Sequence, residues 1–286
     1  MAIVIFDGIA YGMLLYLISV GLSITLGLMN FVNLAHGAFA MIGGYAASLA
    51  MSRLGVPFPV ALLVAFAAGG VAGAVLERVL FARLYSSTHL DQLLLTIGLV
   101  FVCVATATYL FGPTMQAFSL PSYLDGQVRV LDLDVGRYRL FLVLIGGIVV
   151  LSLAALMTQT KFGAMVRACV DNRRVSAGLG LPVGRVYLLA FALGCGLAGF
   201  GGALGLGMLS LDPTFPLKYL IYFLIVVCVG GAGTLSGPFL AALLVGVVDV
   251  ASKYYLPQLG AFVIYVFMVV LLLFRPHGLI PRRGVR

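Results

Sequence analysis

Apolar residues lie along this chain in long runs, separated from one another by charged residues, glycines or prolines. A helix needs roughly 20 apolar residues to cross a bilayer core of about 30 Å, and most of the runs have about that length. Unpaired backbone groups are costly in lipid, so the runs are expected to be helices and not barrel strands. The pattern predicts an all-α fold, a polytopic transmembrane bundle of about eight to nine helices that forms a single domain over residues 1–286. The predicted spans lie near residues 8–28, 31–51, 57–77, 92–112, 140–158, 186–207, 217–231, 238–256 and 260–274.

The seventh run is the shortest, and it leads into the glycine-rich stretch GGAGTLSGP at residues 230–238. So many glycines do not favour a continuous helix. A full span and a broken or re-entrant helix lined by protein are both compatible with this stretch.

Composition supports the assignment to the membrane. Of the 286 residues, 63% are apolar and 9% are charged, which lies outside the range of globular proteins. The four cysteines lie far apart without a CxxC pair, so neither a disulfide framework nor a metal site is expected. The first run lacks both a preceding basic stretch and a cleavage site, so we expect a retained helix and not a signal peptide.

The net charge of +8 follows from basic residues that lie between the apolar runs. This placement indicates a role in membrane topology and not in nucleic-acid binding. With the carboxyl terminus in the cytoplasm and nine spans, the amino terminus lies outside. Eleven of the seventeen lysines and arginines are then cytoplasmic: Arg78, Arg83, Lys161, Arg167, Arg173, Arg174, Arg185, Arg275, Arg282, Arg283 and Arg286.

The long outer loop, about residues 112–139, contains VRVLDLDV after an Asp-Gly pair. Alternation of this kind is typical of a short strand that follows a turn. The loop is either simply solvated or a docking surface for an external partner.

A cytoplasmic loop at about residues 159–185 contains RACVDNRRVSAGLGLPVGRV, an unusually polar stretch for this chain. The sequence predicts a short amphipathic helix from Gly163 to Ala177, then a turn at GLGLP where glycine permits a left-handed backbone and Pro182 ends the helix. One face of that helix would carry Ala164, Arg167, Ala168, Asp171 and Val175, with Arg173 and Arg174 off it. A simpler interpretation is a basic loop that only fixes topology.

Three stretches in order resemble one family of transporters. AGLGLPVGRV after an Asp-Asn pair resembles the coupling loop of ABC importer permeases. NFVNLAHGAFAMIGGYAA at residues 30–47 and GGAGTLSGPFLAALLVGVVD at residues 230–249 are similar to early and late signatures of LivH-type permeases of branched-chain amino acid importers, and RPHGLIPRR resembles their usual end. The resemblance covers nearly the whole chain.

The resemblance implies a transport subunit and not an enzyme, placed in the bacterial inner membrane. It implies a second permease of LivM type, two cytoplasmic ATPases and an extracytoplasmic binding protein as partners, with lipid around the chain and no nucleic acid. No cofactor is expected on this chain: its three lysines follow Thr160, Leu217 and Ser252, so the P-loop lysine has no candidate. ATP and Mg²⁺ are expected on the ATPases.

The resemblance also assigns a coupling role to the cytoplasmic loop, where an ATPase would grip a rigid lever. The expected ATPase-contacting residues are Arg167, Ala168, Asp171, Asn172, Arg173, Arg174, Ala177, Gly180 and Pro182.

Polar groups inside the apolar runs are candidates for the substrate path, because a buried polar group is costly unless it is hydrogen-bonded. The alternatives are bonds across helices or a helix cap for the asparagines and histidine, and close helix packing for the glycines. His36 has no second ligand at metal spacing. The path candidates are Asn30, Asn33, His36, Gly231, Gly233, Thr234 and Ser236.

Asp249 and Lys253 stand four residues apart, a spacing that lets opposite charges meet on one helical face. Ionisable residues at membrane depth are functional candidates. Because Lys253 lies near the end of its span and can reach the interface, a structural pair is favoured over a substrate site.

The predicted function is translocation of leucine, isoleucine or valine delivered by a binding protein. Urea, short amides or other amino acids fit the same architecture, and a simple-sugar permease fits it less well because of the NLAHG stretch. An integral membrane enzyme would need clustered catalytic groups, whereas His36, His89 and His277 lie on separate segments. A free-standing channel would not need a coupling element.

Overall fold

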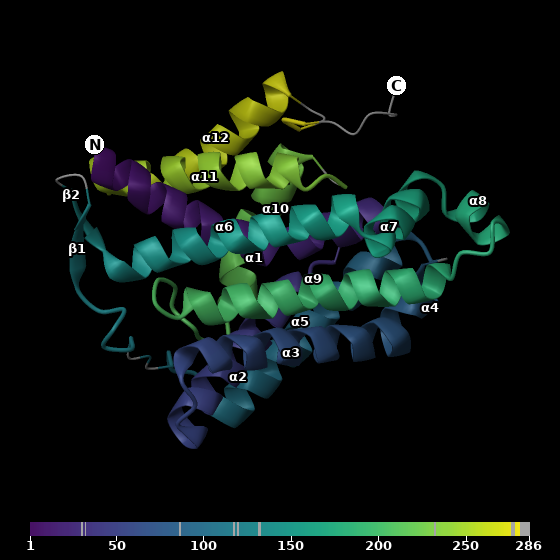
Figure 1. The fold of residues 1–286 in the computed structure, drawn as a ribbon, viewed down its shortest axis with the longest axis horizontal. Coiled ribbons are helices and arrows are strands. Elements are labelled where there is room, and N and C mark those ends of the chain that lie inside the picture. Colours follow the sequence, from purple (N-terminus) through teal and green to yellow (C-terminus); the bar gives the residue numbers. More distant parts are fainter. Residues whose placement is uncertain are drawn as a thin grey trace.

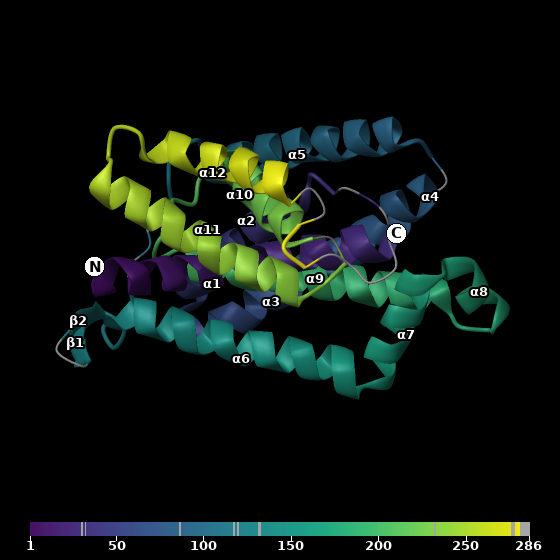
Figure 2. The same ribbon diagram turned by 90° about the horizontal axis from the view of Figure 1, so that it is seen from above.

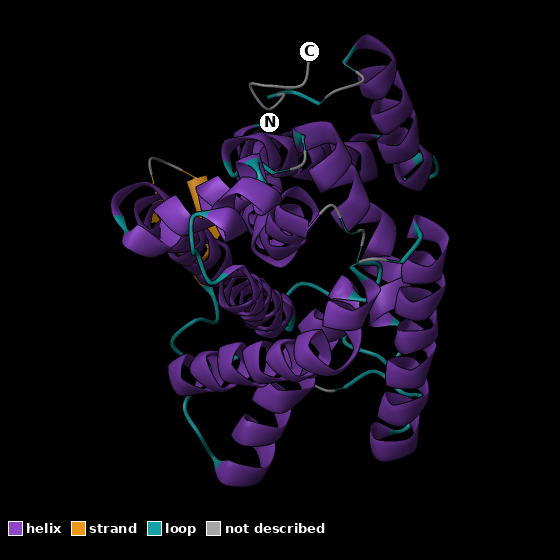
Figure 3. Ribbon diagram, turned by 90° about the vertical axis from the view of Figure 1, so that its right-hand side faces the viewer, coloured by secondary structure: helices purple, strands orange, loops and turns teal. Residues whose placement is uncertain are grey.

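The structure is a computed structural model. It describes residues 1–286 except 30, 32, 86, 117, 119, 131, 132, 232, 276, 277 and 281–286. Helices dominate it, and the described residues include one small pair of strands (Figure 3). The elements in chain order are α1 (Ala2–Met29), α2 (His36–Leu54), α3 (Phe58–Leu76), the π-helical turn η1 (Glu77–Phe81), α4 (Ala82–Leu84), α5 (His89–Phe111), β1 (Gln127–Val130), β2 (Leu133–Gly136), α6 (Arg137–Gln159), α7 (Lys161–Asp171), α8 (Arg173–Gly178), α9 (Val183–Gly205), α10 (Phe215–Gly230), α11 (Ser236–Tyr255) and α12 (Gly260–Phe274).

Each of the nine predicted spans corresponds to a helix of this bundle. Six helices in the described part of the chain are long and apolar enough to cross a membrane: α1, α3 continued through α4, α5, α6, α9 and α11. The helices α10 and α12 contain shorter apolar segments, and α2 is rich in glycine and alanine. The predicted class, an all-α polytopic bundle, is confirmed.

The first helix runs through the middle of the bundle, where it packs against α9 and α11 (Figure 2). Small residues make these close approaches possible. A Cβ added to Gly12 would stand 2.7 Å from the carbonyl oxygen of Ala242 in α11, and one added to Gly21 would stand 2.3 Å from that of Gly194 in α9. Between α2 and α9 the approach is closer still, because a Cβ on Gly202 would stand 1.9 Å from the carbonyl oxygen of Ala40. Without a hydrophobic driving force between helices in lipid, such packing is a main source of stability.

Two helices, α2 and α10, begin inside the bundle. The first residue of α2, His36, bonds to the carbonyl of Ile18, which lies eleven residues before the end of α1, or about 16 Å along its axis. A Cβ on Gly37 would stand 3.1 Å from Cα of Pro216, so the first turns of α2 and α10 lie side by side. The helix predicted from residue 31 therefore starts later, at His36, because residues 31 and 33–35 form a non-helical entry.

The end of the bundle near the amino terminus carries the antiparallel pair β1–β2 (Figure 1). The strand predicted from VRVLDLDV is confirmed as the antiparallel pair β1–β2, and residues 131 and 132 between the two strands lie outside the described residues. Gly126 in the preceding Asp-Gly pair has φ 92°, which glycine adopts without strain. Arg139 of α6 forms an ion pair with Asp7 of α1 and fastens the hairpin side of α6 to the core.

Candidate functional site

The coupling element consists of α7 and α8, which lie at the end of the molecule opposite the amino terminus (Figure 1). The continuous helix predicted from Gly163 to Ala177 is wrong. Asn172 has an extended backbone with φ −156° and ψ 101°, and it separates the two helices. Its side-chain oxygen accepts a hydrogen bond from the Val175 amide at 3.0 Å, which makes it the N-cap of α8. Because of this break, Val175 does not continue the face formed by Arg167 and Asp171.

Both ends of the coupling element are fixed by local hydrogen bonds. The Thr160 hydroxyl accepts from the Gly163 amide at 3.1 Å and caps α7. A Cβ on Gly163 would stand 2.2 Å from the carbonyl oxygen of Met157, so α7 folds tightly against the end of α6. After α8 the predicted turn is present: Gly180 has φ 80°, and the Leu181 amide donates to the carbonyl of Ser176. These contacts make the element a rigid projection.

Eight of the nine candidate coupling residues are exposed, and Ala168 is half-buried. Arg173 has a second role that the sequence did not indicate. Its guanidinium carbon lies 5.8 Å from the ring centre of Tyr85 and 5.2 Å from that of Tyr187. These cation–π contacts hold α8 against the ends of α4 and α9. The available signal for this anchor was a pair of tyrosines at the ends of two spans, Tyr85 just after α4 and Tyr187 near the start of α9.

Tyr85 also connects to a buried carboxylate. Burial raises the pKa of the Tyr85 phenol, so the group stays protonated and can donate. It donates a hydrogen bond to Oε1 of Glu77, at 3.0 Å, in the π-helical turn η1. The anchor of α8 is therefore itself held in one orientation.

Among the path candidates, Asn33 and His36 are fully buried where α2 begins, and Asn30 lies outside the described residues. His36 donates from Nε2 to the Ile18 carbonyl at 2.8 Å, a bond across helices. Asn33 accepts from the Ala35 amide at 3.1 Å, which closes a turn ahead of α2, and the residue at the N-cap position is Ala35. The helix cap that was one alternative for Asn33 is therefore not formed.

Three buried polar atoms near this entry have no hydrogen-bond partner within the described part of the chain: Asn33 Nδ2, His36 Nδ1 and Ser19 Oγ. Native proteins satisfy nearly all such groups, so each one calls for an explanation. Ser19 is the neighbour of Ile18 in α1, to which His36 bonds. The region offers a donor and acceptors that a small polar molecule would satisfy.

The other path candidates form the glycine segment, residues 231 and 233–236. Gly231 and Gly233 have φ 94° and 80°, and these backbone angles interrupt the helical path between α10 and α11. The hydroxyl of Ser23 in α1 donates to the Thr234 carbonyl at 3.1 Å, and a Cβ on Gly27 would stand 2.1 Å from Cα of Gly233. The seventh span is therefore a helix that ends in a packed break, and close packing explains much of its glycine content. Ser236 is exposed at the start of α11.

One cavity of about 220 Å³ brings the two predicted sites together. Its walls include Arg167 and Asp171 of α7 on one side and Gly233 and Thr234 of the glycine segment on the other. Ile24 of α1 also lines it, between Ser23 and Thr25 in sequence. α7 and the break between α10 and α11 thus face each other across this cavity.

The predicted pair Asp249–Lys253 is confirmed, with Nζ of Lys253 2.6 Å from Oδ2 of Asp249. The Asp249 side chain is 1% exposed and that of Lys253 is 52% exposed, so the lysine reaches outward from a buried carboxylate. Tyr222 donates to the other oxygen, Oδ1, at 3.2 Å. This is a satisfied structural cluster that ties α10 to α11.

Lys253→Met is expected to lower the free energy of unfolding by about 2 kcal/mol, because the buried carboxylate loses its charged partner and keeps the Tyr222 bond. Thermal unfolding in detergent measures the effect. Asp249→Asn combined with Lys253→Met should recover most of the stability. A double variant no more stable than Lys253→Met would contradict this account.

No group of three or more His, Cys, Asp and Glu side chains could hold a metal ion in the part of the chain that the structure describes.

The comparisons with known proteins decide the family. The family model described as branched-chain amino acid transport system / permease component matches residues 4–272. The chain belongs to this family of permeases.

Individual relatives match this permease over nearly its whole length. The permease protein BraD of Pseudomonas aeruginosa, of a high-affinity branched-chain amino acid transport system, is 25% identical over 98% of this chain and 95% of its own. The LivH permease protein of Escherichia coli is 24% identical over the same shares. A probable LivH of Methanocaldococcus jannaschii is 27% identical over 95% of this chain and 90% of its own. No solved structure matches the chain significantly.

Membership in this permease family establishes the class of the protein. It is a multi-pass inner-membrane protein and a transport subunit, and the ATP-hydrolysing and substrate-binding components of such importers are separate proteins. The coupling element, the buried polar entry and the glycine segment are thus parts of a permease.

Proposed function

We propose that this permease translocates leucine, isoleucine and valine as one membrane subunit of an ATP-driven importer. The family description and the names of BraD and LivH support the cargo. The observation that carries the mechanism is the cavity shared by α7 and the glycine segment, because it joins the projection to the interior of the bundle.

The complete importer contains a second, LivM-type permease, two cytoplasmic ATPases and an extracytoplasmic binding protein. ATP and Mg²⁺ bind to the ATPases, and hydrolysis there supplies the energy. The amino terminus and the β1–β2 hairpin face outward, while α7, α8 and the carboxyl terminus face the cytoplasm. The basic residues Arg167, Arg173 and Arg174 on α7 and α8 support this orientation.

In this mechanism an ATPase binds α7 and α8, and the ATPase closes when it binds ATP. The rigid element moves as a unit, and α7 transmits the movement through Arg167 and Asp171 to Gly233 and Thr234. Breaks with left-handed glycines are natural hinges, since glycine has no steric penalty there. Asn33 and His36, which we assign to the path, are fully buried where α2 begins.

The polar atoms of the entry suit an amino-acid cargo. Two helices, α2 and α10, present their N-termini near one another, and such ends carry partial positive charge. The carboxylate of an amino acid that passes this point meets those helix ends. The ammonium group of the same amino acid meets the free acceptors of His36 and Ser19.

Uptake competition tests the cargo. Cells that express this chain with its native partners receive labelled leucine, with unlabelled isoleucine, valine, urea, acetamide or ribose as competitors. We expect saturable, ATP-dependent leucine uptake that isoleucine and valine block and the other three do not. Absence of leucine uptake by a complex that is inserted and associated with its ATPase would reject the branched-chain cargo and retain the importer.

A further inference from the structure

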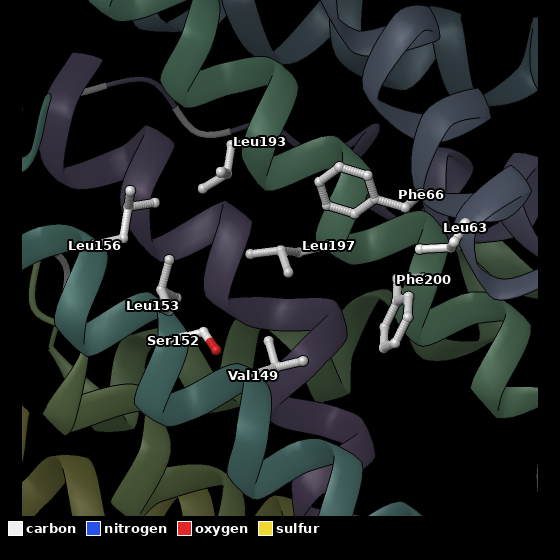
Figure 4. A pocket seen from close by; sticks show the side chains of 9 residues that line it. All are labelled: Leu63, Phe66, Val149, Ser152, Leu153, Leu156, Leu193, Leu197 and Phe200. Carbon is white, nitrogen blue, oxygen red and sulfur yellow. The ribbon is translucent and has the colours of Figure 1, made fainter. Parts of the chain in front are cut away.

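An apolar groove runs between α6 and α3 over the surface of α9, with a volume of about 430 Å³ (Figure 4). Leu63 and Phe66 of α3, Leu153 and Leu156 of α6, and Leu193 and Leu197 of α9 line it. Of its nine lining residues only Ser152 is polar. Leu63 is 65% exposed, so the groove opens toward the lipid-facing surface.

A second cavity of about 830 Å³ lies at the coupling end of the same seam between α3 and α9. Three arginines line it, Arg78 of η1, Arg173 of α8 and Arg185 of α9, together with one carboxylate, Glu77. Neither Arg78 nor Arg185 forms any ion pair found among the described side chains, and Glu77 accepts the Tyr85 hydrogen bond. The cavity therefore carries an excess of positive charge.

One stripe of α9 connects the two cavities. Arg185 and Leu189 line the basic cavity, and Leu193 and Leu197 line the apolar groove, so the four residues follow one another at steps of four positions. This spacing places all four on one face of the helix. From Arg185 to Leu197 the helix rises about 18 Å, close to the roughly 15 Å of half a hydrocarbon core. The linking residue Leu189 is 55% exposed, so the surface between the two cavities is open at this position.

We propose that the two cavities together bind one anionic phospholipid from the leaflet on the α7–α8 side. Its phosphate lies between Arg78 and Arg185, and one acyl chain lies in the groove between α6 and α9. Guanidinium groups bind phosphate oxygens through paired hydrogen bonds, and basic cavities between membrane helices accept charged headgroups. The length of the stripe matches one leaflet, and its charge lies at the headgroup end.

The position of this lipid gives it a consequence for the coupling element. Arg173, which stacks on Tyr85 and Tyr187, lines the same basic cavity. A bound headgroup would therefore lie beside the anchor of α8 and brace it against α9.

Native mass spectrometry of the purified transporter tests the proposal, with phosphatidylglycerol and phosphatidylcholine as probes. Wild-type complex should retain phosphatidylglycerol preferentially. Arg78→Gln with Arg185→Gln should weaken phosphatidylglycerol binding by roughly thirtyfold, about fivefold for each lost charge, with phosphatidylcholine binding unchanged. Arg53→Gln, in the last turn of α2 and outside both cavities, is the control for loss of a surface charge and should bind as wild type. Equal retention of both lipids by wild type, or unchanged binding in the double variant, would overturn the proposal.

The groove has its own matched pair of variants. Ser152→Trp fills the groove, whereas Leu151→Trp places the same ring on a neighbouring exposed position that does not line it. We expect Ser152→Trp to lose phosphatidylglycerol and Leu151→Trp to retain it. If Ser152→Trp keeps phosphatidylglycerol while the arginine variant loses it, and inorganic phosphate competes, the basic cavity binds free anions and the lipid assignment is wrong. A disulfide between Ser152→Cys and a cysteine in the second permease would show a protein helix in the groove, which also overturns it.

Discussion

Gly202→Ala is expected to destabilise this permease by at least about 3 kcal/mol, although it adds one methyl group. The new Cβ would stand 1.9 Å from the carbonyl oxygen of Ala40 and 3.0 Å from its Cα. Those are backbone atoms of α2, so no side chain can rotate away, and α2 and α9 must separate. Separation disturbs the entry at His36, because that residue begins α2. The measurements are the yield of monodisperse protein and its thermal unfolding temperature in detergent.

Gly98→Ala is the matched control. Gly98 lies in α5, and a Cβ there meets no atom within 4 Å. In a helix interior, alanine is favoured over glycine by up to about 1 kcal/mol, so this variant should be as stable as wild type or slightly more stable. Equal unfolding temperatures for Gly202→Ala and Gly98→Ala would mean that α2 and α9 do not pack as described.

Arg173→Glu with Arg174→Glu is expected to lower substrate uptake by roughly thirtyfold, equivalent to about 2 kcal/mol of lost interaction with the ATPase. Both side chains are exposed on α8, where the proposed ATPase contact lies. The protein should still insert, because neither residue lies within a span. Labelled-leucine uptake and co-purification of the ATPase measure the two consequences.

Single variants separate docking from the anchoring of α8. Arg173 stacks on Tyr85 and Tyr187, and its reversal both repels the ATPase and loosens α8. Arg174→Glu changes the surface charge without touching those rings and should reduce ATPase co-purification on its own. Arg53→Glu, exposed at the end of α2, should leave co-purification unchanged. Wild-type uptake by the double variant would remove the coupling role from α8.

The spans could be predicted because membrane thickness sets the length of an apolar run. The break in the coupling element could not be found in the same way. Asn172 lies in an amphipathic pattern that continues on both sides, and only its preference for the N-cap position marks the start of α8. An asparagine also fits an exposed helix position, so local pattern alone did not decide between them.

The sequence indicated which polar residues are candidates for the site, but not which of them lie close to one another. The sequence marked His36, Thr234 and Arg167 as polar positions of interest. It could not show that Arg167 and Thr234 line one cavity, since they are far apart in the chain, one in α7 and the other in the glycine segment between α10 and α11. The anchor of Arg173 on two tyrosines was missed for the same reason.

The central position of α1 has a consequence for how the permease is made. α1 precedes α11 in the chain and so leaves the ribosome before it, yet α11 is one of its main partners and begins at Ser236, more than two hundred residues later. At about 5–20 residues per second, α1 waits roughly 10–45 s for that partner. During this time Ser19, Ser23 and Thr25, all buried in the finished bundle, face either lipid or the insertion machinery. The order of synthesis thus requires that the polar side chains of α1 are kept out of lipid until α11 has been inserted.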